Sequence, residues 1–104
     1  MSGDGSADKV RTFDLELYWP GVTPDAVVEL AGRVQSAAAT LAAADHPVRF
    51  LGATLSLRDE VCFLRLQATR GDVDALARAA QLVEPRVSEI VAWSGAHAAG
   101  PASE

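Results

Sequence analysis

The sequence predicts an α+β sandwich in which a four-stranded antiparallel sheet carries two helices on one face. Two segments, 24–44 and 73–82, place apolar residues at the three- and four-residue spacings of amphipathic helices. Four other apolar-rich segments, several of them alternating with period two, are typical of β-strands. The resulting order is strand, helix, strand, strand, helix, strand, which is a split βαβ unit used twice.

The first strand is expected to start near Val10 and to bury one face. Its apolar positions alternate with polar ones, and they are Phe13, Leu15, Leu17 and Trp19. The pair Pro20–Gly21 ends the strand.

The first helix is predicted from Pro24 to about Ala44. Thr23 suits the N-cap, Pro24 the first helical position, and Asp25 the positive end of the helix dipole. Glu29 and Arg33 form an expected i,i+4 pair on the exposed side. The helix is expected to end before Pro47, because the residue preceding a proline avoids the helical region.

A β-hairpin is predicted at 48–69, with the polar connection 58–60 between its arms. Strict alternation directs four residues of the first arm to the helices: Leu51, Ala53, Leu55 and Leu57. The same rule directs four residues of the second arm there: Cys62, Leu64, Leu66 and Ala68. Phe50, Gly52 and Thr54 of the first arm, and Phe63, Arg65 and Gln67 of the second, are then expected on the opposite face.

Gly71–Asp72 is expected to cap the second helix at 73–82, and 87–93 is the expected last strand. Right-handed crossovers with both helices on one face give a ferredoxin-like fold with spatial strand order 4-1-3-2. We expect one domain at 10–93, a disordered tail at 1–9 and a flexible tail at 94–104.

Composition excludes several classes of function. The 104 residues carry a net charge of −5, and the nine basic residues are scattered, so neither nucleic acid nor an anionic membrane surface is an expected partner. No apolar run approaches a membrane span of about 20 residues. A single cysteine cannot form an internal disulfide, and we expect a cytoplasmic protein.

The sheet face opposite the helices is the expected site of association. It combines aromatic, charged and amide side chains in a way that commonly marks an interface. The residues expected on this binding or dimer face are Tyr18, Phe50, Phe63, Arg65 and Gln67. We therefore expect a homodimer with two-fold symmetry.

Few residues offer chemistry. Asp14, Glu16, Tyr18 and Arg65 share the open face and are the catalytic candidates, because paired carboxylates can act as acid and base when their environments differ. Asp45 and His46 are the metal candidates, although two ligands fall short of the three or four that a transition metal takes. Cys62 lies in mid-strand and is expected to be a buried apolar residue.

The hairpin resembles a known family. Leu51–Leu55 (LGATL) and Asp59–Phe63 (DEVCF) are similar to a family of small, mostly actinobacterial proteins of unknown function that includes nickel-binding and nickel-responsive members. The resemblance extends through Pro85–Val91 and covers about half of the chain. It implies a ferredoxin-like fold and a dimer. Nickel-associated members tend to have His where this chain has Gly52, so we assign no metal or other cofactor.

These observations favour a small dimeric binding or regulatory module over an enzyme. A small-molecule ligand of this module would be expected in the dimer cleft or between the helices and the sheet. One alternative is a cofactor-free enzyme of the dimeric α+β-barrel type, an isomerase or oxygenase acting on a small aromatic or polyketide-like substrate. The other is a degenerate nickel-responsive protein that uses Asp45 and His46.

Overall fold

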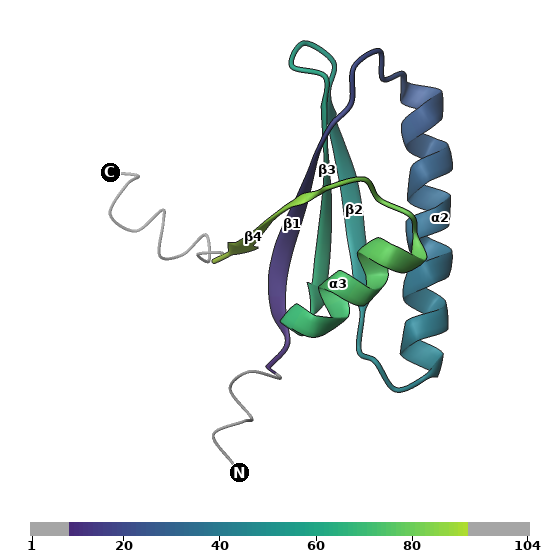
Figure 1. The fold of residues 1–104 in the computed structure, drawn as a ribbon, viewed down its shortest axis with the longest axis vertical. Helices are drawn as coiled ribbons and strands as arrows, with labels where there is room; N and C mark the ends of the chain where they lie inside the picture. Colours follow the sequence, from purple (N-terminus) through teal and green to yellow (C-terminus); the bar gives the residue numbers. More distant parts are fainter. Residues whose placement is uncertain (1–8, 92–104) are drawn as a thin grey trace, which may run out of the picture.

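The computed structural model describes residues 9–91, and these form the predicted ferredoxin-like α+β fold (Figure 1). The six elements follow the predicted order along the chain. They are β1 (Arg11–Tyr18), α2 (Pro24–Ala43), β2 (Arg49–Ser56), β3 (Val61–Ala68), α3 (Arg70–Ala79) and β4 (Arg86–Ile90).

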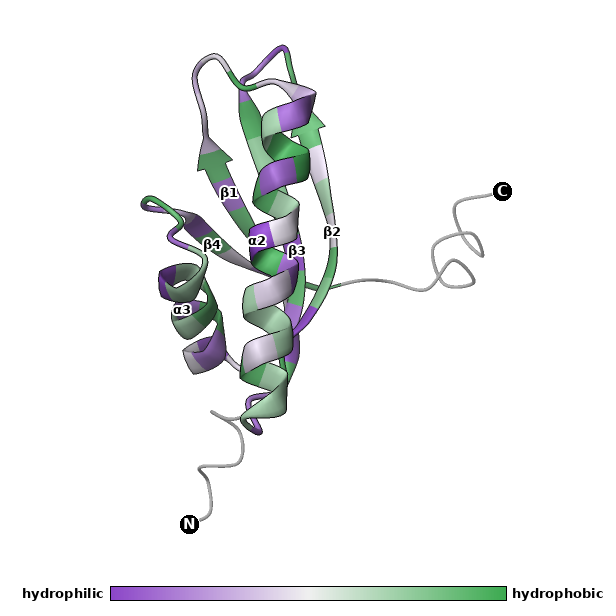
Figure 2. Cartoon of the chain, turned by 90° about the vertical axis from the view of Figure 1, so that its right-hand side faces the viewer, coloured by the Kyte–Doolittle hydropathy of each residue, from purple (hydrophilic) through white to green (hydrophobic). Residues whose placement is uncertain are grey.

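The sheet has the strand order β2-β3-β1-β4, and every neighbouring pair is antiparallel. This order is the predicted 4-1-3-2 arrangement read from the other edge. Both helices lie on the same side of the sheet, as the side view in Figure 2 shows. The opposite face of the sheet carries no helix among the described residues.

The core fills the layer between the sheet and the helices. Its fully buried large side chains come from β1, β3, α2 and α3, and they are Leu15, Leu64, Leu66, Val34, Val73, Leu76 and Cys62. The expectation that Cys62 is a buried apolar residue is therefore confirmed.

The second helix begins one turn earlier than predicted. Thr69, not Gly71–Asp72, is the N-cap, and its Oγ1 accepts a hydrogen bond from the Asp72 backbone N–H at 3.1 Å. A threonine hydroxyl satisfies one of the unpaired N–H groups of the first turn. At α2 the predicted cap is confirmed, because Thr23 Oγ1 accepts from Ala26 N–H at 3.2 Å.

Both helices end in a Schellman arrangement. At α2, His46 N–H donates to Leu41 O and Asp45 N–H to Ala42 O. At α3, Leu82 N–H donates to Ala77 O and Gln81 N–H to Arg78 O. This motif requires one left-handed residue, which glycine usually provides. Here the residues are Asp45 with φ 68° and Gln81 with φ 60°.

The predicted side-chain orientation of the first hairpin arm is wrong at its start. The pairing of β2 with β3 shifts between Phe50 and Gly52, so Leu51 is the extra residue of a β-bulge. Phe50 therefore lies opposite Leu66 and packs against the core, whereas Leu51 is 44% exposed. Strict period-two alternation, on which the prediction depended, fails across such a bulge.

The last strand is shorter than expected. It ends at Ile90, and the predicted continuation to Trp93 lies outside the described residues. The expected tails at 1–9 and 94–104 also lie outside them, apart from Lys9.

The Schellman geometry leads to a stability prediction. Gln81→Gly should raise the free energy of unfolding by about 1 kcal/mol, because glycine adopts φ near 60° without steric cost. Urea denaturation followed by circular dichroism measures the change.

The matched control is Gln35→Gly, a change of the same residue types at an exposed interior position of α2. It should lower stability by about 1 kcal/mol. If both substitutions are destabilising, Gln81 is not under left-handed strain.

Candidate functional site

The open face of the sheet is built by alternate residues of the strands. On β1 these are Thr12, Asp14, Glu16 and Tyr18, and on β3 they are Val61, Phe63, Arg65 and Gln67. The residues that lie between them on each strand face the core. Because side chains alternate along a strand, the residues named here must face the opposite side of the sheet. Of the five residues expected on the binding face, four belong to this surface, and Phe50 does not.

A bidentate ion pair occupies the centre of this face. Arg65 Nε donates to Asp14 Oδ1 at 2.8 Å and Arg65 Nη2 to Asp14 Oδ2 at 3.0 Å. The two residues face each other across β1 and β3. The hydrogen bond from Arg65 and the negative charge of Asp14 raise the pKa of the guanidinium above its ordinary value. The guanidinium of Arg65 therefore stays charged and is neutralised by the carboxylate that it contacts.

A shallow hollow lies beside this ion pair. Gly52 is opposite Arg65 in the register, so no side chain fills that position on β2. The hollow has a volume of about 530 Å³ and is lined by Asp14, Leu51, Gly52, Ala53, Thr54, Phe63 and Arg65. We call it the sheet hollow. It gathers an aromatic ring, a hydroxyl group and an ion pair on one open surface.

The other catalytic candidates lie outside the sheet hollow. Glu16 faces Phe63 on one side and Arg86 on the other in the strand register. Tyr18 is at the end of β1, is 71% exposed and pairs with Val61. The structure therefore brings Asp14 and Arg65 into direct contact and leaves Glu16 and Tyr18 apart from them along β1.

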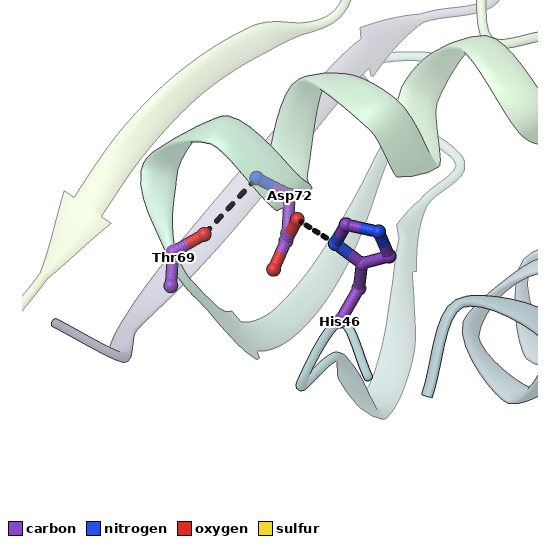
Figure 3. Close-up of polar contacts among 3 residues, drawn as sticks. All are labelled: His46, Thr69 and Asp72. Carbon is purple, nitrogen blue, oxygen red and sulfur yellow. Dashed lines mark hydrogen bonds and ion pairs between the residues drawn. The ribbon is translucent and has the colours of Figure 1, made fainter. Parts of the chain in front are cut away.

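The metal candidate His46 has a partner that the sequence did not suggest. Its Nδ1 lies 3.0 Å from Asp72 Oδ1, and Asp72 is positioned by the N-cap of α3 (Figure 3). Asp45 instead takes the left-handed conformation that ends α2. Within residues 9–91 no three His, Cys, Asp or Glu side chains are grouped as metal ligands. Nothing in this region adds a third ligand to Asp45 and His46.

Arg33 also has a different partner from the one expected. Its Nε donates to the backbone O of Ala80, the C-cap residue of α3, at 3.3 Å. No ion pair joins Arg33 to Glu29 among the described residues. The i,i+4 rule considers one helix alone, and here α3 provides a competing acceptor.

Comparison of the chain with protein-family models, with curated proteins and with solved structures finds no match. Neither helix in residues 9–91 has the length and apolar character needed to cross a bilayer.

Burial leads to a prediction for the thiol of Cys62. The side chain is completely buried, and desolvation raises its pKa above the ordinary value. At pH 8.5 the folded protein should react with Ellman's reagent at least about 100-fold more slowly than the protein unfolded in guanidinium. In the unfolded protein the thiol has its ordinary, lower pKa and ionises more readily. The thiol therefore stabilises the folded state fully when the pH is below that ordinary pKa. This stabilisation decreases as the pH rises above the ordinary pKa of the thiol.

The reaction is followed by absorbance on stopped flow, and Cys62→Ala gives the zero-thiol baseline. A native rate close to the unfolded rate would show that Cys62 is accessible.

The His46 contact leads to a second prediction. Nickel chloride should change the melting temperature of the wild type and of His46→Ala equally, within about 1 °C, because the described residues gather no three metal-ligating side chains around His46. Differential scanning fluorimetry measures both. His97 is common to the two proteins and cancels in the comparison. A nickel-induced stabilisation that is lost in His46→Ala would contradict this prediction and show that His46 binds nickel.

Proposed function

We propose that this protein is a small cytoplasmic binding module that works as a homodimer, with the open sheet face as the contact surface. The observation that carries the proposal is the half-buried Phe63 beside the Asp14–Arg65 ion pair on a sheet face that no described helix covers.

The charges on this face are compatible with burial in an interface. A buried charge without a partner is strongly destabilising, whereas a hydrogen-bonded pair retains much of its compensation when water is removed. Asp14 and Arg65 already satisfy each other within one chain. A partner surface therefore needs to supply no counter-charge to this pair, and Phe63 and Gln67 are suited to apolar contact and hydrogen bonds with it.

Chain length gives the proposal a second argument. A domain the size of residues 9–91 buries a limited share of its surface and gains stability from association. Covering one face of the sheet with an identical face buries a second layer of side chains in a two-layer fold. A two-fold axis through the sheet face makes the contact self-complementary.

The sheet hollow favours one second candidate function. Two such faces packed together would enclose the hollow, and an enclosed cavity holding a carboxylate and a guanidinium suits a cofactor-free isomerase or oxygenase of the dimeric α+β-barrel type. Arg65 would then stabilise a developing oxyanion and Asp14 would position Arg65, with Glu16 and Tyr18 at the rim. This candidate requires the dimer and fails with it.

The nickel-responsive alternative has no such observation in its favour in residues 9–91. The resemblance of the DEVCF hairpin to the family with nickel-binding members remains a prediction from the sequence.

The dimer predicts a mass in solution of twice 10.9 kDa. Phe63→Glu should weaken the association by at least about ten-fold, because it places two carboxylates near the two-fold axis. Sedimentation equilibrium measures the mass of both proteins across a concentration series.

The control is Val28→Glu, which adds the same charge on α2 at a side chain that is 72% exposed and away from the sheet face. Its mass should equal that of the wild type. A wild-type monomer at about 100 μM would end the proposal, since a specific interface of standard size binds well below that concentration.

A further inference from the structure

A second concavity lies on the helix side of the molecule, separate from the sheet hollow. It is a cavity of about 260 Å³ between the end of β1, the first half of α2 and the segment that joins α3 to β4. Six of its lining residues carry the argument: Leu17, Leu30, Leu82, Val83, Trp19 and Arg33. We call it the helix–loop cavity.

We propose that the helix–loop cavity binds a small monocarboxylate with an apolar body. Tyr18 of the open sheet face also lines this cavity, but the six residues named above do not belong to that face, and the proposal does not require the dimer.

The walls of the cavity suit the apolar body. Leu17 and Leu30 are buried core residues that line it, and Trp19 and Leu82 pack against the same core. Val83 is 81% exposed. A ligand that covers these surfaces removes apolar area from water on both sides of the contact.

Arg33 suits the carboxylate. Among the described residues that line the cavity, it is the only charged one. Its Nε is anchored to Ala80 O, which orients the guanidinium at the end of α3. No carboxylate of the described chain lies within ion-pair distance of Arg33, so its positive charge is uncompensated there. A guanidinium presents parallel N–H groups that match the two oxygens of a carboxylate.

The two concavities therefore differ in the charge they offer. In the sheet hollow Arg65 is already neutralised by Asp14, whereas Arg33 faces only a backbone carbonyl within residues 9–91. The volume of the helix–loop cavity lies just below the roughly 300 Å³ at which pockets for drug-sized ligands begin, which limits the ligand to a small molecule.

The test uses octanoate and octanamide, which share one apolar body and differ in charge. The intrinsic fluorescence of Trp19 reports binding in the full chain carrying Trp93→Phe, which removes the second tryptophan. Octanoate should change the Trp19 emission saturably. Octanamide should bind at least about ten-fold more weakly, because it lacks the charge that pairs with Arg33.

Three variants assign the effect to Arg33. Arg33→Gln should weaken octanoate binding about ten-fold, to the level of octanamide, and Arg33→Lys should retain a preference for octanoate. Arg49→Gln makes the same change in net charge on β2, outside the cavity lining, and should leave the affinity unchanged. Circular dichroism verifies that each variant is folded.

Equal affinity for the two probes would overturn the proposal, as would unchanged octanoate binding in Arg33→Gln. The absence of any saturable response to octanoate up to about 10 mM would also overturn it. If Arg33→Gln does not fold, the comparison of octanoate with octanamide in the protein that retains Arg33 decides the proposal, and equal affinity overturns it.

Discussion

Three apolar pairs face each other across β1 and β3 beneath the two helices: Phe13 with Leu66, Leu15 with Leu64, and Leu17 with Cys62. All six side chains are buried. A slip of one residue by either strand would turn the three side chains of that strand to the open face and expose the core. The helices can pack only on the register that keeps these pairs inward, so the architecture of the described chain depends on this pairing.

The same register creates the open face. Because Leu15 must point inward, Asp14 points outward, and because Leu64 must point inward, Arg65 points outward and meets Asp14. The ion pair is thus a consequence of core packing on the other side of the sheet. The β-bulge at Leu51 adds a second consequence, since it returns Phe50 to the core and places Gly52 opposite Arg65. The sheet hollow exists where these two effects coincide.

The helix ends organise the other side of the molecule. Thr69 starts α3 directly after β3, and its bond to Asp72 N–H helps to position the carboxylate that contacts His46 at the end of α2. At the other end of α3, the left-handed Gln81 turns the chain toward β4 and brings Leu82 and Val83 over the end of β1. Arg33 joins this turn to α2 through Ala80 O. Two polar contacts thus join α3 and its ends to α2 and the segment after it, and the helix–loop cavity lies between α2 and the turn after α3.

The sequence by itself determined the element order, the buried face of β1 and β3, and the start of α2, because these follow from local periodicity and from Thr23–Pro24. It also placed Asp14 and Arg65 on one face. It could not reveal the bulge, because a single extra residue leaves no mark in the composition of Phe50–Gly52 and is defined only by the partner strand. Nor could it find the contacts of His46 with Asp72 or of Arg33 with Ala80, which are 26 and 47 residues apart. Those contacts depend on the packing of α3 against the rest of the fold, and only the tertiary structure decides which polar groups then come within reach of each other.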